Sequence, residues 1–312
     1  MLVLAMDTST PAITAGVVEL LLPHQVTPPH QVTPPQQATP PHQLTPHPGI
    51  QRDSDHGQQD PVRLLAEDVA VDPFGHAEKL LPLITAALTS VGRSLDELDA
   101  VVVGLGPGPF TGLRVGIATA ASLGDALGVP VHGVPSHDGL ARSIPARSAA
   151  ARSIPARSTA ARSLPERSLP ERSTAAPSAD GTPALLVVTD ARRREVYLSG
   201  YAPGGRRVFG PAVLAPAAVD PSAILGSAAL DGFLAVGAGV GLVPVLEQQP
   251  LADPGSLSRG LVLAAGRELV TGAIPGPLVP LYLRRPDVAE PSAPKSTLNA
   301  AATSNSQVGG RS

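Results

Sequence analysis

Short apolar runs and segments of helical periodicity alternate along the chain, outside two low-complexity stretches. Three strands, a helix, a strand and a helix, followed by a second such set, predict an α/β protein with two subdomains. Ser94–Glu97 fits a capping box that opens a short helical turn. The predicted helices are His76–Val91, Thr111–Leu127 and Leu257–Val270, and the predicted strands are Leu2–Met6, Ile13–Glu19, Leu64–Asp72, Val101–Val103, Ala184–Thr189, Glu195–Tyr201 and Phe233–Val236.

Two insertions interrupt this pattern. Residues 23–60 repeat a six-residue unit rich in Pro, which favours extended, solvated chain. In residues 142–180 an Arg recurs every five positions, a step that would scatter the charge around a helix. We expect both insertions and the tail 291–312 to be disordered. The remaining chain then divides into an N-terminal subdomain, 1–141, and a C-terminal subdomain with a terminal segment, 181–290.

Each insertion leaves a functional alternative open. The histidines of the first would bind a metal only weakly; they are His24, His30, His42 and His47. The arginines of the second would grip RNA through its phosphates, as an RNA-delivering module. The alternative for the first insertion is a disordered linker, and the alternative for the second is an expanded repeat without a specific function.

The loop Gly104–Gly116 joins a predicted strand to a helix, where α/β proteins often place phosphates. A P-loop needs four residues between its glycines and a following Lys. Here five residues separate Gly106 from Gly112, and no Lys follows. Pro107 and Pro109 also lack the N–H groups that a phosphate cradle uses. The sequence therefore favours a rigid loop that orients the helix.

Small residues mark one face of that helix. They recur every four positions, which places them in one line. Each Gly inside a helix costs about 1 kcal/mol relative to Ala, a cost tolerated where another backbone must come close. The partner is either a neighbouring element of this chain or another subunit. The residues are Gly112, Gly116, Ala120 and Gly124.

Composition narrows the class of protein. The 312 residues include no Cys, which excludes a disulfide framework and a thiolate site. The net charge of −3 conceals seven arginines and two glutamates between 142 and 172, so the remainder is clearly acidic and a poor nucleic-acid binder. No signal-peptide pattern follows Met1, and the apolar runs are shorter than the ~20 residues of a membrane span. We expect a cytoplasmic protein.

Several motifs together resemble the TsaB family, the bacterial accessory subunits of the machinery that makes threonylcarbamoyladenosine in tRNA. The likeness covers nearly all of the chain outside the insertions, and Pro280–Pro286 fits the terminal signature of that family. The motifs are Asp7–Ser9, His76–Pro82, Gly106–Arg114, Gly133–Ser136 and Asp190–Arg193.

The resemblance implies the actin-like ATPase (ribonuclease H-like) fold and a role as a non-catalytic scaffold subunit, a pseudoenzyme. Such a subunit pairs with a catalytic paralogue of the same fold, and an ATPase subunit joins them. It would contact tRNA only indirectly, and the partners, not this chain, would use ATP and a metal. The two N-terminal helices would form a bundle with the paralogue. The predicted interface residues are His76, Leu80, Leu83, Ala87, Gly112, Gly116, Ala120 and Gly124.

The chemistry of the paralogue is missing from the matching positions. Its metal is held by two histidines four residues apart on one helix, but here Leu80 follows His76. The phosphate turn of the paralogue is Ser-Gly-Gly, where this chain has Asp190-Ala191-Arg192. An older glycoprotease-like label finds no support either, because the His-Glu-x-x-His pattern is absent. We therefore predict no catalytic and no metal-binding residue.

The sequence leaves two interpretations open for His76 and two for Asp7. His76 either hydrogen-bonds at the start of its helix or contacts the partner. Asp7 is either a turn residue or the relic of a phosphate-and-magnesium site. A self-sufficient nucleotide hydrolase that depends on Asp7 is the alternative function. A vestigial nucleotide site would comprise Asp7, Thr8, Asp190, Gly237 and Gly239.

Overall fold

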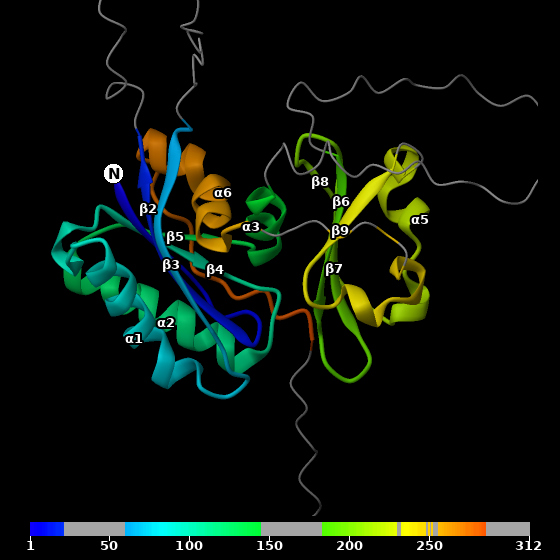
Figure 1. Cartoon of the computed structure of the whole chain (residues 1–312), viewed down its shortest axis with the longest axis horizontal. Coiled ribbons are helices and arrows are strands. Elements are labelled where there is room, and N and C mark those ends of the chain that lie inside the picture. Colours follow the sequence, from blue (N-terminus) through cyan, green and yellow to red (C-terminus); the bar gives the residue numbers. More distant parts are fainter. Residues whose placement is uncertain are drawn as a thin grey trace, which may run out of the picture.

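The computed structural model describes residues 1–21, 60–144, 183–229, 232–247, 249, 251 and 255–284. The first insertion, apart from residue 60, most of the second and the whole tail therefore lie outside the described residues. The described chain forms a five-stranded sheet of order β3-β2-β1-β4-β5 and a four-stranded sheet of order β8-β7-β6-β9 (Figure 1).

The two sheets are built on one plan. In each, three antiparallel strands are extended by a strand that runs parallel to the first of them. This repeat confirms the predicted α/β fold of the actin-like type. The first sheet comprises β1 (Leu2–Asp7), β2 (Ala12–Leu20), β3 (Val62–Val71), β4 (Ala100–Gly104) and β5 (Val131–Val134). The second comprises β6 (Ala184–Asp190), β7 (Val196–Tyr201), β8 (Arg207–Leu214) and β9 (Phe233–Val236).

The helices cover the sheets in layers (Figure 1). Helices α1 (His76–Ser90) and α2 (Phe110–Leu127) pack on one face of the first sheet, and α6 (Leu257–Thr271) packs on the other. Helix α3 (Ser136–Ser143) packs against α6 and also against the second sheet. The far face of the second sheet is covered by α5 (Pro221–Leu225) and by short 3-10 turns, among them Val240–Leu242 and Pro244–Leu246.

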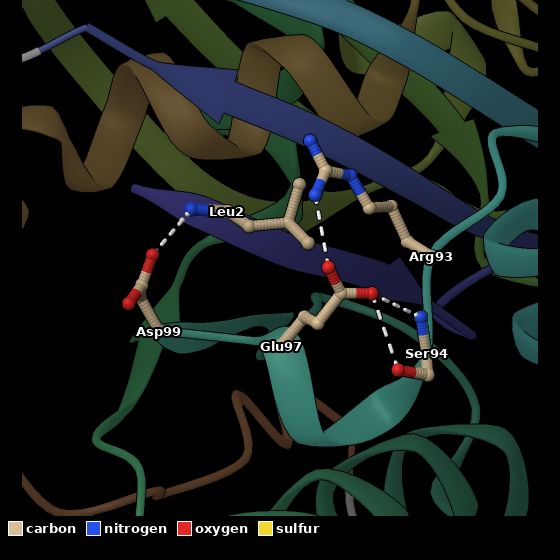
Figure 2. Close-up of polar contacts among 5 residues, drawn as sticks. All are labelled: Leu2, Arg93, Ser94, Glu97 and Asp99. Carbon is tan, nitrogen blue, oxygen red and sulfur yellow. Dashed lines mark hydrogen bonds and ion pairs between the residues drawn. The ribbon is translucent and has the colours of Figure 1, made fainter.

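Local signals in the sequence fix several element ends. Helix α2 stops at Gly128, which adopts the left-handed conformation with φ of 69°. The predicted capping box is confirmed: the Glu97 carboxylate accepts hydrogen bonds from the Ser94 backbone N–H at 2.8 Å and from its hydroxyl at 3.1 Å (Figure 2). Nearby, Asp99 accepts from the Leu2 N–H at 2.6 Å, which ties this turn to the first strand. Among the described helices, none is both long and apolar enough to cross a bilayer.

Among the elements that were not predicted, two strands and one helix were missed for identifiable reasons. Strand β5 has only four residues, and β8 contains Gly210 and Pro211, which read as a turn. Helix α3 includes Arg142 and Ser143, which match the arginine repeat in sequence but belong to the fold. The predicted boundary at residue 142 is therefore too early, since Ile144 is also buried.

The C-terminal part of the chain returns to the first sheet. The hydrophobic face of α6 covers β1, β2 and β4 through Leu261, Val262, Ala265 and Leu269. The N-terminus of α6 is fixed by Glu67 of β3, which accepts hydrogen bonds from the Ser258 N–H at 2.7 Å and the Ser256 hydroxyl at 2.9 Å. A single C-terminal subdomain, 181–290, thus does not describe the packing, because α6 completes the N-terminal half.

Candidate functional site

Asp7 stands at the end of β1, next to the glycine loop that follows β4. Its side chain is fully buried, and both carboxylate oxygens have partners. Oδ1 accepts from the Ser9 N–H at 2.8 Å and the Ser9 hydroxyl at 2.6 Å, and Oδ2 accepts from the Ser136 hydroxyl. The Gly106 N–H donates to the same hydroxyl at 3.0 Å. The carboxylate is therefore occupied by its own chain.

The environment of Asp7 also disfavours its charge. Burial raises the pKa of the carboxyl above its usual range, opposed by the hydrogen bonds from Ser136 and Ser9. A carboxylate that is to hold Mg²⁺ needs open oxygens. We therefore interpret Asp7 as a structural residue that joins β1 to the start of α3, and the sequence offered no signal that Ser136 would be its partner.

The glycine loop and the start of α2 press against the turn between β1 and β2. A Cβ at Gly108 would collide with the backbone of Ser9, and one at Gly112 with the carbonyl oxygen of Thr8. The Thr8 hydroxyl donates to the Gly112 carbonyl at 2.7 Å. These contacts leave the loop no room for a phosphate between it and the turn, which supports the prediction of a rigid, helix-orienting loop.

The small-residue face of α2 lies inside the chain, which corrects the expectation that its residues contact a partner subunit. A Cβ at Gly116 would collide with the Thr8 hydroxyl, and one at Gly124 with Val131 of β5. Ala120 is fully buried in the same core. On α1, Leu80 and Ala87 are buried in that core as well, and Leu83 packs against it. Of the two partners left open for this face, the structure shows an intrachain one.

His76 and Leu80 do not fit a metal site. The Nε2 atom of His76 lies 2.9 Å from the Thr10 carbonyl oxygen, so the ring is hydrogen-bonded at the start of α1. Leu80, one turn further on the same face, is 1% exposed and packs in the core. Within the residues that the structure describes, no group of three or more His, Asp or Glu side chains is arranged to hold a metal ion.

The turn between β6 and β7 is closed by its own groups. Asp190 accepts from the Arg192 N–H at 2.7 Å, and thereby takes a backbone donor that a phosphate would need. Arg192, Arg193 and Arg194 all have positive φ, of 64°, 51° and 62°, which is uncommon for residues with side chains. The turn is stabilised by a hydrogen bond from the Ala191 N–H to the Glu195 carbonyl at 3.0 Å and by one from the Glu195 N–H to the Arg192 carbonyl at 3.0 Å.

The remaining residues of the predicted vestigial site pack against β6. A Cβ at Gly237 would collide with the Val188 carbonyl, and one at Gly239 would lie 2.7 Å from the Thr189 carbonyl carbon. Gly239 also donates its N–H to the Val188 oxygen at 3.0 Å. These glycines serve close packing of a turn, whereas Asp7 and Thr8 are engaged with α2 and α3. Each residue of the predicted vestigial nucleotide site therefore packs against or hydrogen-bonds to neighbouring residues of this chain.

A C-terminal strap, residues 277–284, links the two halves. The Leu281 N–H donates to the Leu105 carbonyl at 2.8 Å. Tyr282 stacks on Phe110 at 4.2 Å between ring centroids, and Arg114 donates to the Tyr282 hydroxyl at 3.0 Å. At the other end Arg284 donates to the Ala191 carbonyl at 3.0 Å. The terminal signature therefore fixes the glycine loop and the β6–β7 turn relative to each other.

Helix α3 forms a second link between the halves. Its His137 is 1% exposed and lies 2.9 Å from the hydroxyls of both Ser199 and Thr189 on the second sheet. Burial lowers the pKa of His137 to about 3, so the ring is neutral at physiological pH. Sequence reasoning missed this residue, because its partners are more than fifty positions away.

The side of α1 and α2 that faces away from the sheet carries few charges. Between Lys79 and Ser90, α1 has no charged residue, and Leu81 is 52% exposed. We call the exposed residues of the two helices the outer face: Ala77, Glu78, Lys79, Leu81, Pro82, Thr85, Ala86, Thr89 and Ser90 of α1, and Thr111, Arg114, Ala118, Ser122, Asp125 and Ala126 of α2. Its charged residues are confined to Glu78 and Lys79 in the first turn of α1 and to Arg114 and Asp125 of α2. A helix face with so few charges is typical of a protein–protein contact.

The sequence of this chain matches those of an uncharacterized protein, of a protein named TsaB and of the TsaD family. An uncharacterized protein of Mycobacterium tuberculosis is 37% identical over 286 residues, which cover 91% of this chain and 92% of that protein. The Escherichia coli K12 protein named tRNA threonylcarbamoyladenosine biosynthesis protein TsaB is 40% identical over 62 residues, 20% of this chain and 27% of that protein. The family model described as TsaD, tRNA N6-adenosine threonylcarbamoyltransferase, matches residues 74–159.

Solved structures show the same fold. A Pseudomonas aeruginosa protein described as uncharacterized, with similarity to the peptidase YeaZ, superposes with a TM-score of 0.52 and 26% identity. The match covers 89% of this chain and 99% of that one. YeaZ from Pseudomonas aeruginosa superposes with a TM-score of 0.50 at 24% identity, which speaks for the fold alone. Together with the motifs Gly106–Arg114 and Asp190–Arg193, these matches show that the chain belongs to the TsaB-like family.

Proposed function

We propose that this chain is a non-catalytic subunit of the system that makes threonylcarbamoyladenosine in tRNA, and that it docks to and stabilises a catalytic paralogue of its own fold. An ATPase subunit would join the pair, and this chain would contact tRNA only indirectly, through its partners. Membership of the TsaB-like family is the observation that carries the proposal. The match of residues 74–159 to the TsaD family supports a paralogue as the partner.

The geometry of the matching positions supports a role without catalysis. Leu80 fills a core position where a second metal-binding imidazole would stand, and His76 is hydrogen-bonded to Thr10. The oxygens of Asp7 are taken by Ser9 and Ser136. A metal or a magnesium-bound nucleotide would have to displace these contacts. We therefore assign ATP and metal to the partner subunits and none to this chain alone.

The docking surface that we propose is the outer face of α1 and α2. It replaces the glycine face of α2 as the predicted interface, because that face is filled by Thr8 and Val131. On the outer face the small side chains Ala118, Ser122 and Ala126 of α2 would let a partner helix approach closely. Leu81 is an exposed apolar anchor on the adjacent α1. Two such helix pairs would associate as a four-helix bundle.

The test is capture of the paralogue by purified full-length chain. Leu81→Glu puts a charge into the centre of the proposed contact, and burial of an unpaired charge typically weakens an interface strongly. We expect at least a tenfold loss of affinity for the paralogue, which corresponds to about 1.4 kcal/mol or more. Val270→Glu is the matched control, because Val270 is 44% exposed on α6, on the opposite side of the first sheet.

Both variants should melt like the wild-type chain, since neither residue is buried. Equal affinity of the Leu81→Glu variant and the wild type would contradict the docking face, while leaving the complex itself possible elsewhere on the surface. Failure of the wild-type chain to bind any paralogue, with or without the ATPase subunit, would contradict the proposed function as a whole.

A further inference from the structure

A polar cavity of about 180 Å³ lies where the two halves meet, away from the outer face of α1 and α2. It is bordered by α3, α6 and the turn that joins β7 to β8. Its polar lining consists of three arginines together with an aspartate, a tyrosine and a glycine: Arg142, Arg206, Arg207, Asp138, Tyr201 and Gly205. Neither the family motifs nor the proposed function uses this place.

The charges in the cavity are unbalanced. Asp138 accepts hydrogen bonds from the Tyr201 hydroxyl at 2.7 Å and from Arg207 at 3.1 and 3.3 Å, so Arg207 compensates its charge. Burial, followed by the charge of Asp138, raises the pKa of Tyr201, which keeps that hydroxyl a donor. Within the described part of the chain, Arg142 and Arg206 form no ion pair. The cavity therefore has two positive charges left over.

The backbone leaves room for a ligand beside these arginines. Gly204 and Gly205 have φ of 81° and 74°, a left-handed pair that turns the chain sharply from β7 into β8. A Cβ added at Gly205 would meet no atom within 4 Å, so open space lies above the turn. Pockets for whole drug-sized molecules start at roughly 300 Å³. The cavity is smaller, and suits one ionic group rather than an entire nucleotide.

We propose that this cavity binds the doubly charged phosphoryl group of a phosphate monoester. The two uncompensated guanidinium groups match its charge, and guanidinium is the side chain best suited to bidentate phosphate contacts. The group would come from free phosphate or from a larger monoester whose remainder lies outside the cavity. Because Arg142 belongs to α3 and Arg206 to the second sheet's hairpin, the bound group would also bridge the two halves.

Calorimetric titration of the full-length chain in chloride buffer tests the site with three probes: inorganic phosphate, AMP and adenosine. Phosphate and AMP should bind, and adenosine should not. Equal affinities would identify free phosphate as a sufficient ligand, whereas tighter binding of AMP would identify a larger monoester. Absence of binding by both phosphate and AMP, or equal binding of adenosine and AMP, would overturn the proposal.

Charge removal distinguishes the cavity from general attraction. The double variant Arg142→Gln/Arg206→Gln should weaken phosphate and AMP binding by roughly tenfold for each lost arginine. Its melting temperature without ligand should stay unchanged, because both side chains are exposed. The control Arg63→Gln/Arg93→Gln removes two charges from β3 and from the turn after α1, and neither residue lines the cavity. An equal loss of affinity in the control would show nonspecific attraction and refute the site.

Discussion

At the scale of single residues, the glycines of α2 are determined by what they touch. Thr8 lies against both Gly112 and Gly116, donates its hydroxyl to the Gly112 carbonyl, and is itself fully buried. A side chain at either glycine would have to displace this threonine or push α2 away from the sheet. The helix therefore accepts the propensity cost of its glycines in exchange for contact with the β1–β2 turn.

Gly116→Leu should accordingly destabilise the isolated chain. Overpacking typically costs roughly 1–3 kcal/mol, and the bond between Thr8 and Gly112 would be strained in addition. Ala118→Leu is the control on the same helix, because Ala118 is exposed. We expect a lowered melting temperature for Gly116→Leu only. An unchanged melt for Gly116→Leu would mean that the glycine face is not packed as described.

His137 gives a second residue-scale prediction, on pH. Its pKa is about 3 in the folded chain and near 6.5 when unfolded, so below pH 6.5 only the unfolded state takes up the proton. The free energy of unfolding should therefore fall by about 2 kcal/mol between pH 7 and pH 5 through this residue alone. His137→Gln keeps a donor and an acceptor for Ser199 and Thr189 but does not titrate.

Urea unfolding at pH 7 and pH 5 measures this difference. The loss of stability on acidification should be about 2 kcal/mol smaller in His137→Gln than in the wild type. Acidification changes the contribution of Asp7 in the opposite direction: because its pKa is raised in the folded chain, the folded state takes up the proton more readily and the free energy of unfolding rises. This contribution is the same in the wild type and in His137→Gln. Identical losses in the two proteins would show that His137 becomes protonated without unfolding.

At the scale of elements, the sequence predicted most strands and helices because each has a local signature. The apolar run Val101–Val103, the capping box at Ser94 and the stop at Gly128 all act within a few residues. Helix α3 was obscured, because Arg142 and Ser143 continue the arginine repeat in sequence. The burial of Ile144 shows that this segment belongs to the fold, although its local sequence pattern matches the arginine repeat.

The candidate site shows the same limit. The glycine face of α2 was recognised from spacing, but its partners Thr8 and Val131 come from the first and fifth strands and their turns. Asp7 was recognised, while Ser136 was not, since 129 positions separate them. The cavity between the halves depends on Arg142 and Arg206, which approach only when α3 packs beside the β7–β8 turn. Contacts between residues so far apart along the chain leave no local pattern in the sequence.

At the scale of the whole molecule, the insertions join points that the fold already holds together. The Leu21 N–H donates to the Pro61 carbonyl at 2.8 Å across the ends of the first insertion. On either side of the second, Ile144 and Leu185 belong to one hydrophobic cluster. Because the free energy of loop closure changes slowly with loop length, neither insertion is needed to bring these ends together.

Replacement of residues 23–59 and 146–182 by short Gly/Ser linkers should therefore preserve a cooperative melt and capture of the paralogue. A control that extends the second deletion to include Ile144 should lower the melting temperature, because it empties a buried position. Loss of complementation in cells by the first variant, with its melt intact, would reveal a function of the insertions that the folded body does not need.

The return of α6 to the first sheet has a consequence for the order in which the protein is made. A ribosome releases β1 to β5 long before Leu261, Val262 and Leu269, which cover one face of that sheet. Until then the apolar residues Val3, Val18 and Val102 have no cover from this helix. The N-terminal half therefore cannot mature alone during translation, and the nascent chain must keep that face from aggregating until nearly all of its length has emerged.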